Sequence, residues 1–443
     1  MTTQVNTAQL TAMMQDARQR TLELVEGLSA DQLMGPKIQT VNPLRWEIGH
    51  VAYWYEYFIS RSLDGEKSLL GARADELYDS IAVAHDTRWD LPLMSLEDTL
   101  SYMQGVMDRL VDRLGTISQD NMASESDSFI YLFGIFHEDM HTEAFLWGRQ
   151  TLAYPTPKLA VAEEVICERA TGPCPGYAEI PGGKFRMGAE IDAPFLFDNE
   201  KYAHDVEVAP FAIARAPVTN SEYSEFVEAD GYINDAYWCE DGIAWRNMRN
   251  IDHPGYWVKD GPGRWRMRRF EHDIELPENE PVIHVSWYEA NAYCRWAGLR
   301  LPTELEWEVA ALGMPAADGS LATTKRRYPW GDTPPTSNCA NLDARALGSI
   351  DVGALPDGDS AFGCRQMLGN VWEWTADRFL PFPDFAPDSY KEYSKNLFGN
   401  TRVLRGGAWT TRGRMMHGTY RNYFSPDRWN IFSGFRTCRS VLK

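Results

Sequence analysis

The stretch Phe136-His137-Glu138-Asp139-Met140-His141-Thr142-Glu143 places two histidines four residues apart on a helical pattern. Residues at this spacing share one face of an α-helix, so the two imidazoles point the same way. Two neutral imidazoles one turn apart make half of a site for a first-row metal, whereas a core position would favour Leu or Phe. We therefore predict that His137 and His141 bind a metal.

Two other interpretations apply to the same letters. The histidines can be hydrogen-bonded core residues, or they can belong to the His-Glu-x-x-His pattern of zinc proteases, with Glu138 as general base. The protease pattern needs a third ligand downstream, and no Gly turn or His follows His141. Glu143 lies about 200° around the helix from His141, at about 100° per residue, and is not expected to be a ligand.

The first 150 residues have the periodicity of a four-helix bundle. Apolar residues recur at a spacing of three to four in segments that we assign as helices, at residues 8–28, 43–57, 95–114 and 129–149. Histidines on the second and fourth helices predict a metal site between facing helices. The long segment 64–94 is polar and aromatic, which predicts a functional loop.

The second helix carries the third candidate ligand. Asn42 can cap it and Pro43 suits its first turn. One face of this helix is lined by Trp46, His50, Tyr53, Trp54 and Tyr57. A structural histidine is the alternative for His50, but the pair at 137 and 141 favours metal ligation.

The rest of the chain differs in composition and periodicity. Pro- and Gly-rich residues 151–175 predict a linker, and residues 176–443 predict an α+β domain with helical periods only at 287–299 and 303–312. The predicted domains are thus 1–150 and 176–443.

Composition limits the possible partners. The formal charge of -20 disfavours phosphate backbones and anionic lipid, and we find no basic patch, so small molecules are the expected partners, without nucleic acid, membrane or an obligate protein partner. No apolar run is long enough to span a bilayer, so the expected location is cytoplasmic. The seven cysteines are scattered and include no Cys-x-x-Cys pair, which predicts reduced thiols.

A series of motifs beyond residue 175 resembles the formylglycine-generating-enzyme fold, a C-type-lectin-like architecture also called the sulfatase-modifying-factor domain. The motifs stand at residues 180–188, 217–223, 281–287, 300–308, 369–374, 405–409 and 434–436. Those enzymes use paired cysteines near the chain end to bind copper, and residues 415–424 contain none. That activity is not expected here. Asn370 and Glu373 are candidate ligands of a structural Ca2+ in this fold.

The first 150 residues resemble a DinB-like bundle, and the two folds together are similar to the ergothioneine-type sulfoxide synthases, including the selenoneine synthase branch. The resemblance implies a mononuclear non-haem Fe(II) that uses O2 to join a thiol to the imidazole carbon of hercynine, the trimethylated betaine of histidine. It implies that His50, His137 and His141 are the facial iron ligands. Three neutral ligands leave the ferrous ion its full charge, which favours thiolate coordination.

The resemblance also assigns residues to the substrate. Asn422 matches an Asn of the betaine site, and Tyr423 offers an aromatic face to a quaternary ammonium, although an ordinary packed strand is the alternative. Tyr390, Tyr393 and Tyr420 are candidates for the catalytic proton donor.

Three departures from relatives concern other residues. Met140 replaces a Gln of some relatives, so its contact with the substrate imidazole is expected to differ. Ile81 and Ala82 stand where one branch has paired tyrosines, so the acid of that branch is not expected here.

The third departure is that no methyltransferase domain follows the second fold, so the ovothiol-making architecture is not expected. A further difference concerns the sulfur donor. Relatives that use γ-glutamylcysteine hold its carboxylates with two arginines and its amine with an Asp, where this chain has His85, Arg88 and Phe424. An unpaired buried charge costs several kcal/mol, so we predict a smaller or less charged donor, either cysteine or a neutral selenosugar.

The predicted function is Fe(II)- and O2-dependent formation of a carbon-sulfur or carbon-selenium bond on hercynine. The alternative in the same chemistry is a selenoneine synthase that uses a selenosugar. Alternatives of other classes are a thiol-dependent transferase with zinc or nickel in the bundle and a binding module with a vestigial metal site.

Overall fold

The chain divides into two compact units in a computed structural model that describes residues 3–117, 121–162 and 171–441. The first unit contains Met1–Ala160 and Asp192–Phe195, and the second contains Val161–Ile191 and Leu196–Lys443. The predicted linker, 151–175, includes residues 163–170, which lie outside the described residues. Its boundaries stay a prediction.

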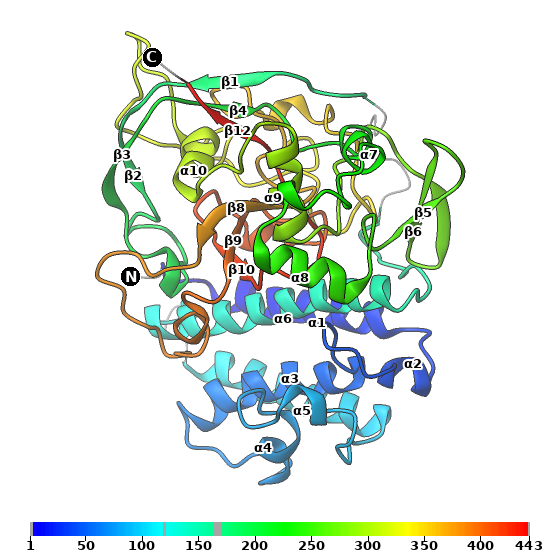
Figure 1. Cartoon of the computed structure of the whole chain (residues 1–443). Helices are drawn as coiled ribbons and strands as arrows, with labels where there is room; N and C mark the ends of the chain where they lie inside the picture. The colour runs from blue at the N-terminus through cyan, green and yellow to red at the C-terminus, as the bar shows by residue number, and fades with distance from the viewer. Residues whose placement is uncertain (1–2, 118–120, 163–170, 442–443) are drawn as a thin grey trace. The chain divides into compact units, whose positions relative to one another are not determined.

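The first unit is a bundle built on four long helices (Figure 1). These are α1 (Thr7–Val25), α3 (Leu44–Tyr55), α5 (Leu96–Ile117) and α6 (Glu125–Thr151), with the short helices α2 (Ala30–Met34) and α4 (Arg73–Tyr78) between them. Helix α1 packs against α6, and α3 packs against both α5 and α6. The predicted four-helix bundle is therefore confirmed, and its second and fourth long helices carry the three histidines.

Helix α3 differs from its prediction at both ends. The sequence predicted Asn42 as the cap, but Pro43 is the N-cap and makes no side-chain cap bond. The side chain of Asn42 bonds to Glu47 and Arg88 instead. At the other end the chain continues as a π-helical turn, Glu56–Arg61. This change of period removes Tyr57 from the inward stripe, where the sequence predicted it, and leaves it 38% exposed.

The segment predicted as a loop, 64–94, contains helix α4 and a 3-10 turn at His85–Thr87. The ring of Tyr78, the last residue of α4, lies against Gly49 on α3. A Cβ at Gly49 would stand 2.2 Å from the Tyr78 ring, so only glycine fits at this position. Six residues are too few for the periodicity to show α4 in the sequence.

Among its described residues, the second unit combines four small sheets with four helices, as the predicted α+β class requires. The largest sheet has the order β10-β9-β8-β11. It is formed by β8 (Trp372–Arg378), β9 (Arg402–Arg405), β10 (Asn422–Phe424) and β11 (Ser433–Gly434). Strand β10 runs antiparallel to β9 at one edge, with Asn422 opposite Leu404.

The smaller sheets have the orders β1-β4-β12, β2-β3 and β5-β6-β7. Their strands are β1 (Tyr177–Ile180), β2 (Gly183–Met187), β3 (His204–Val208), β4 (Phe211–Ala214), β5 (Trp257–Lys259), β6 (Trp265–Arg269), β7 (His272–Glu275) and β12 (Cys438–Ser440).

Two of the four helices of the second unit were predicted, α9 (Trp287–Trp296) and α10 (Glu304–Leu312). The prediction missed α7 (Asn220–Glu228) and α8 (Glu240–Arg249). Helix α7 begins with a capping box between Thr219 and Glu222, a signal that was visible in the sequence. Helix α8 is short and largely polar, so it has no clear apolar period.

A buried ion pair and an amide network join motifs of the second unit. Glu373 accepts two hydrogen bonds of 2.6 Å from Arg436 and one of 3.0 Å from the Trp307 indole. The side-chain oxygen of Asn370 accepts from Asn341 and from the backbone N–H of Ile350. These contacts do not support the predicted Ca2+ site, because a guanidinium already neutralises the carboxylate.

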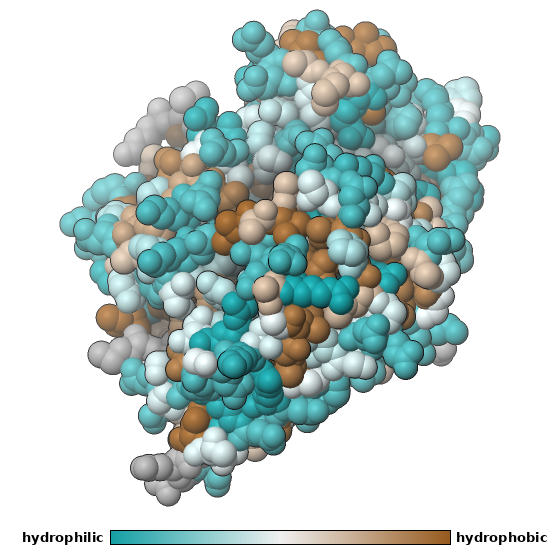
Figure 2. Space-filling model, turned by 90° about the horizontal axis from the view of Figure 1, so that it is seen from below, coloured by the Kyte–Doolittle hydropathy of each residue, from teal (hydrophilic) through white to brown (hydrophobic). Residues whose placement is uncertain are grey.

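The surface agrees with the acidic composition. Figure 2 shows that hydrophilic residues cover most of the face drawn, with hydrophobic residues gathered across its middle. In the part of the chain that the structure describes, no helix combines the length and apolar character that a bilayer crossing requires. The six described cysteines are free thiols, and Cys167 lies outside the described residues.

Replacing Arg436 with Met should destabilise the second unit by about 3–5 kcal/mol, because it leaves the buried Glu373 carboxylate without its partner. Urea unfolding followed by tryptophan fluorescence would measure the loss. Arg186→Met, which breaks a surface pair with Glu190, is the matched control and should shift the unfolding curve little. Equal shifts for the two variants would show that the buried pair has no special importance.

Candidate metal centre

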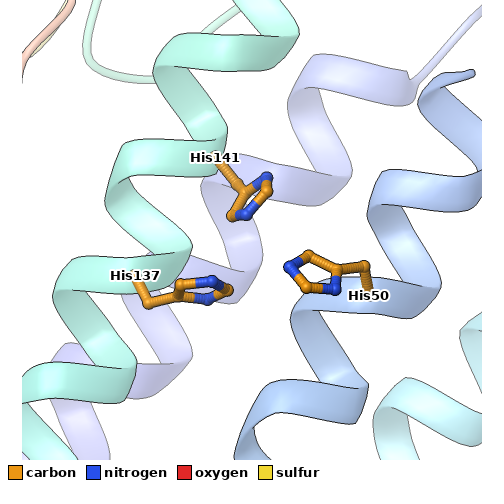
Figure 3. A group of neighbouring side chains, drawn as sticks. All are labelled: His50, His137 and His141. Carbon is orange, nitrogen blue, oxygen red and sulfur yellow. The ribbon is translucent and has the colours of Figure 1, made fainter. Parts of the chain in front are cut away.

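Three imidazoles converge between α3 and α6, as Figure 3 shows: His50 from α3 faces His137 and His141 from α6. The ring centroids are 4.6 Å apart for the α6 pair, and 4.9 and 5.3 Å apart from His50 to His141 and His137. One nitrogen from each ring lies within 4.8 Å of the others. Three nitrogens at this separation have a common point within about 3 Å of each, so small side-chain rotations would bring them to the metal-nitrogen distance of about 2.0–2.1 Å.

Helix α4 fixes the tautomer of His50. The Nδ1–H of His50 donates to the backbone carbonyl of Tyr78 at 2.8 Å, so the lone pair on Nε2 is left for a metal. The close contact between Tyr78 and Gly49 holds that carbonyl in place. A histidine oriented by a backbone carbonyl is a common feature of metal sites.

Two of the imidazoles are buried against tryptophan rings. Trp46 stacks on His50 at 4.8 Å, and Trp54 stacks on His137 at 5.1 Å. Burial, and then the charge of the neighbouring His141, holds the pKa of both His50 and His137 well below the usual value. Two of the three rings are therefore unprotonated at neutral pH, which is the form that binds metal. The donor set fits a first-row divalent ion, although it does not choose among iron, nickel and zinc.

The sequence analysis missed Glu47, a buried carboxylate beside the cluster. Its Oε1 lies 3.6 Å from the Nδ1 of His141 and accepts a hydrogen bond of 2.9 Å from Asn42. The signal was an acidic residue one turn before His50 on the same helix. Its neighbour His141 is on another helix, so spacing alone did not indicate the contact.

The zinc-protease interpretation is wrong, because Glu138 faces away from the cluster. Its Oε1 accepts hydrogen bonds from Arg18 at 3.0 Å and from Thr21 at 2.9 Å, both on α1. The carboxylate is fully buried in this contact between helices. It therefore cannot act as a general base at the metal.

The other residues of this unit that are predicted to bind substrate lie on the 64–94 segment and on α6. The Nε2 of His85 lies 2.9 Å from the carbonyl oxygen of Val41, and its ring meets Trp89 edge to face. The guanidinium of Arg88 packs over the Trp46 ring at 3.8 Å. Met140 is half-buried on α6, one residue before His141. Their roles in substrate binding stay predictions.

The predicted tyrosines of the second unit form one cluster. The ring of Tyr393 lies 6.3 Å from that of Tyr390 and 6.0 Å from that of Tyr423, and the Tyr423 hydroxyl donates to the Tyr393 carbonyl. Tyr420 is buried and packs against Phe197, on which Tyr393 also stacks. Desolvation, and then Tyr420 and Tyr423, raise the pKa of Tyr393, so its phenol is protonated at neutral pH.

Strand β10 carries the residues predicted to meet the betaine. The side-chain oxygen of Asn422 accepts from the backbone N–H of Tyr423 at 2.8 Å, which leaves its NH2 group as a donor. One face of the Tyr423 ring stacks on Phe379 at 4.1 Å. Phe424 is half-buried, with the Arg428 guanidinium 5.6 Å from its ring centroid. The strand is thus packed, and its substrate role stays a prediction.

Comparison with known proteins identifies both units. Residues 162–441 match the sulfatase-modifying factor enzyme 1-like domain, and residues 13–145 match the DinB superfamily. A hercynine oxygenase of Mycobacterium tuberculosis is 38% identical over 431 residues, which cover 97% of this chain and 98% of the relative. The chain belongs to the hercynine oxygenase family. A hercynine oxygenase of Mycolicibacterium smegmatis is 37% identical and covers 96% of this chain and 97% of its own length.

Membership of the hercynine oxygenase family confirms the predicted resemblance and the prediction that the chain is an oxidoreductase of the oxygenase type. A formylglycine-generating enzyme of Streptomyces coelicolor is 32% identical, but the match covers only 59% of this chain and 88% of that relative. The match with hercynine oxygenases therefore extends over the bundle, which holds the histidine cluster.

His50→Ala should abolish stable metal binding, because two ligands on α6 cannot enclose the ion alone. The expected result is metal content near zero by elemental analysis after reconstitution, with an unchanged unfolding transition of the second unit. His253→Ala, on a half-exposed histidine of the second unit, is the control and should keep its metal. A His50→Ala protein with full metal content would remove His50 from the ligand set.

Proposed function

We propose that this enzyme is an Fe(II)- and O2-dependent sulfoxide synthase that joins a small donor to the imidazole carbon of hercynine. The observation that carries the proposal is the convergence of three imidazoles, two buried and one half-buried, in a chain similar over almost its full length to hercynine oxygenases. His50, His137 and His141 would hold the iron.

The three ligands suit this chemistry by their lack of charge. Ferrous iron, when bound by three neutral imidazoles, keeps its full positive charge and supplies a site that attracts a thiolate or selenolate and activates O2. The stacked rings of Trp46 and Trp54 shield His50 and His137 from water. They also fix the planes of these two imidazoles.

Residues of the second unit are proposed to bind hercynine and to supply a proton. The NH2 group of Asn422 suits the carboxylate of hercynine, and the Tyr423 face opposite Phe379 suits its trimethylammonium group. Tyr393 is the proposed proton donor among the clustered tyrosines, because its raised pKa keeps the phenolic proton in place until the reaction takes it.

Two residues favour a donor that is smaller or less charged than γ-glutamylcysteine. The guanidinium of Arg88 donates to Asn42 at 2.7 Å and to the carbonyls of Val83 and Ser80 at 3.2 and 3.4 Å. It is thus largely engaged within its own segment. Phe424 stands where relatives that bind γ-glutamylcysteine have an acidic residue. A neutral selenosugar, which makes the enzyme a selenoneine synthase, is the second candidate donor, beside cysteine.

The proposal predicts O2 consumption that depends on both iron and hercynine. The protein should be reconstituted anaerobically with Fe2+ and given hercynine with cysteine, γ-glutamylcysteine and a selenosugar at equal concentration, with product measured by mass. Cysteine or the selenosugar should dominate, because γ-glutamylcysteine would bring charged groups that find no partner. Protein loaded with Zn2+ or Ni2+ is the control for the transferase alternative. Turnover without O2, or dominant use of γ-glutamylcysteine, would contradict the proposal.

Asn422→Ala should weaken hercynine binding by about tenfold, the loss expected for one hydrogen bond to a charged group of about 1.5 kcal/mol. Calorimetric titration of the iron-loaded protein with hercynine would measure it, together with iron content, which should not change. Asn400→Ala, on an exposed turn, is the control. Unchanged hercynine affinity in the Asn422 variant would place the betaine elsewhere.

A further inference from the structure

A chain of polar side chains connects the 64–94 segment to His141. The Nη1 of Arg88 donates to the Oδ1 of Asn42 at 2.7 Å, and the Nδ2 of Asn42 donates to the Oε1 of Glu47 at 2.9 Å. That same oxygen stands 3.6 Å from the Nδ1 of His141, slightly beyond hydrogen-bonding distance. All four residues belong to the first unit.

The two charged members of this chain of side chains are buried, which makes an unpaired charge among them energetically costly. Glu47 is 3% exposed and Arg88 is 8% exposed, so water provides little compensation for either charge. The Nδ1 of His141 is also buried, and no hydrogen-bond partner was found for it among the described residues. A buried N–H group and a buried carboxylate 3.6 Å apart complement each other, and a small rotation of the imidazole would bring them into contact.

Arg88 reaches the cluster by a second route. Its guanidinium covers the Trp46 ring at 3.8 Å, and the His50 ring also stacks on Trp46, 4.8 Å away and tilted by only 9°. Arg88 therefore contacts the supports of two of the three imidazoles. Its own hydrogen bonds close the 80–88 turn, through the carbonyls of Ser80 and Val83.

We propose that Glu47 is a positioning residue for the metal centre, held by Asn42 and Arg88. It takes the Nδ1–H of His141, which fixes the tautomer with the Nε2 lone pair directed to the metal. The carboxylate also makes that imidazole a stronger electron donor. Arg88 then has a structural role at the centre, separate from any contact with the donor substrate. The inference rests on the proposed metal site, but not on the identity of the metal or the substrates.

The test measures metal affinity in the absence of any substrate. Metal-free full-length protein should be titrated with Co2+, with the visible absorption bands of the bound ion as readout. Glu47→Gln should raise the Kd by about tenfold and Glu47→Ala by up to about 100-fold, the range found when a partner of a metal-bound histidine is removed. The energies of the absorption bands should shift as well, because the His141 donor strength changes.

The control is Glu56→Gln, which alters another fully buried carboxylate that follows α3. Glu56 accepts from Ser68, from the Leu69 backbone and from Tyr102, away from the cluster. This variant should lose stability yet bind Co2+ with the wild-type Kd and spectrum. A structural effect alone would move the two Glu→Gln variants together.

Two further variants test the rest of the connection and guard against misfolding of the Glu47 variants. Asn42→Ala and Arg88→Lys keep Glu47 but remove hydrogen bonds of the connection that holds its carboxylate in position. Each should therefore weaken Co2+ binding several-fold in the absence of the sulfur or selenium donor. If Arg88 served only the donor, its variant would bind Co2+ normally. Unchanged Kd and spectrum in the Glu47 and Asn42 variants, with an active wild type, would overturn the positioning role alone. A wild type that binds no metal would overturn both this role and the proposed function.

Discussion

The close approach of α3 to α6 is the constraint on which the metal centre depends. It is possible because Gly134 on α6 has no side chain: a Cβ there would stand 2.4 Å from the ring of Tyr55 on α3. With the helices at this separation, His50 meets the pair on α6, and aromatic rings exclude water around them. Burial then lowers the pKa of His50 and His137, which keeps these two imidazoles in the neutral form that binds metal. The convergence of the three candidate ligands is thus a consequence of helix packing as much as of the histidines themselves.

The segment between α3 and α5 has two roles. It carries the positions at which the donor is expected to bind, His85 and Arg88, and it also supplies the carbonyl of Tyr78 that orients His50. A change in this segment can therefore alter the orientation of His50 as well as the contacts proposed for the donor. The guanidinium of Arg88 packs over Trp46, which in turn stacks on His50, so the two effects are coupled through this residue as well.

Sequence periodicity was sufficient to predict the long helices and the candidate histidine ligands, because an i, i+4 pair and an aromatic stripe are local patterns. The motifs of the second domain were likewise sufficient for its fold. What could not be predicted were contacts between distant residues and departures from regular period. Glu47 was missed because its partner is on α6, and the inward position of Tyr57 was wrong because a π-helical turn follows α3. Glu373 and Arg436 were both visible in motifs, but only the fold shows that they form a pair that displaces the expected cation.

The position of strand β10 is set by charge more than by strand pairing. Its three residues pair with β9 on one side only, and a short edge strand is weakly held by such pairing. The residue before it, Arg421, is buried and binds both oxygens of Glu304 at 2.7 and 3.0 Å, while Arg405 on β9 binds the same carboxylate at 2.8 Å. Glu304 opens α10, so one carboxylate joins this helix to the strand and to the approach to Asn422. Because breaking a buried network is costly, Asn422 and Tyr423 are presented from a rigid base even though they lie at a sheet edge. Residues 415–424 contain no cysteine, so what holds Asn422 and Tyr423 in place is this network of buried charges together with the single pairing to β9.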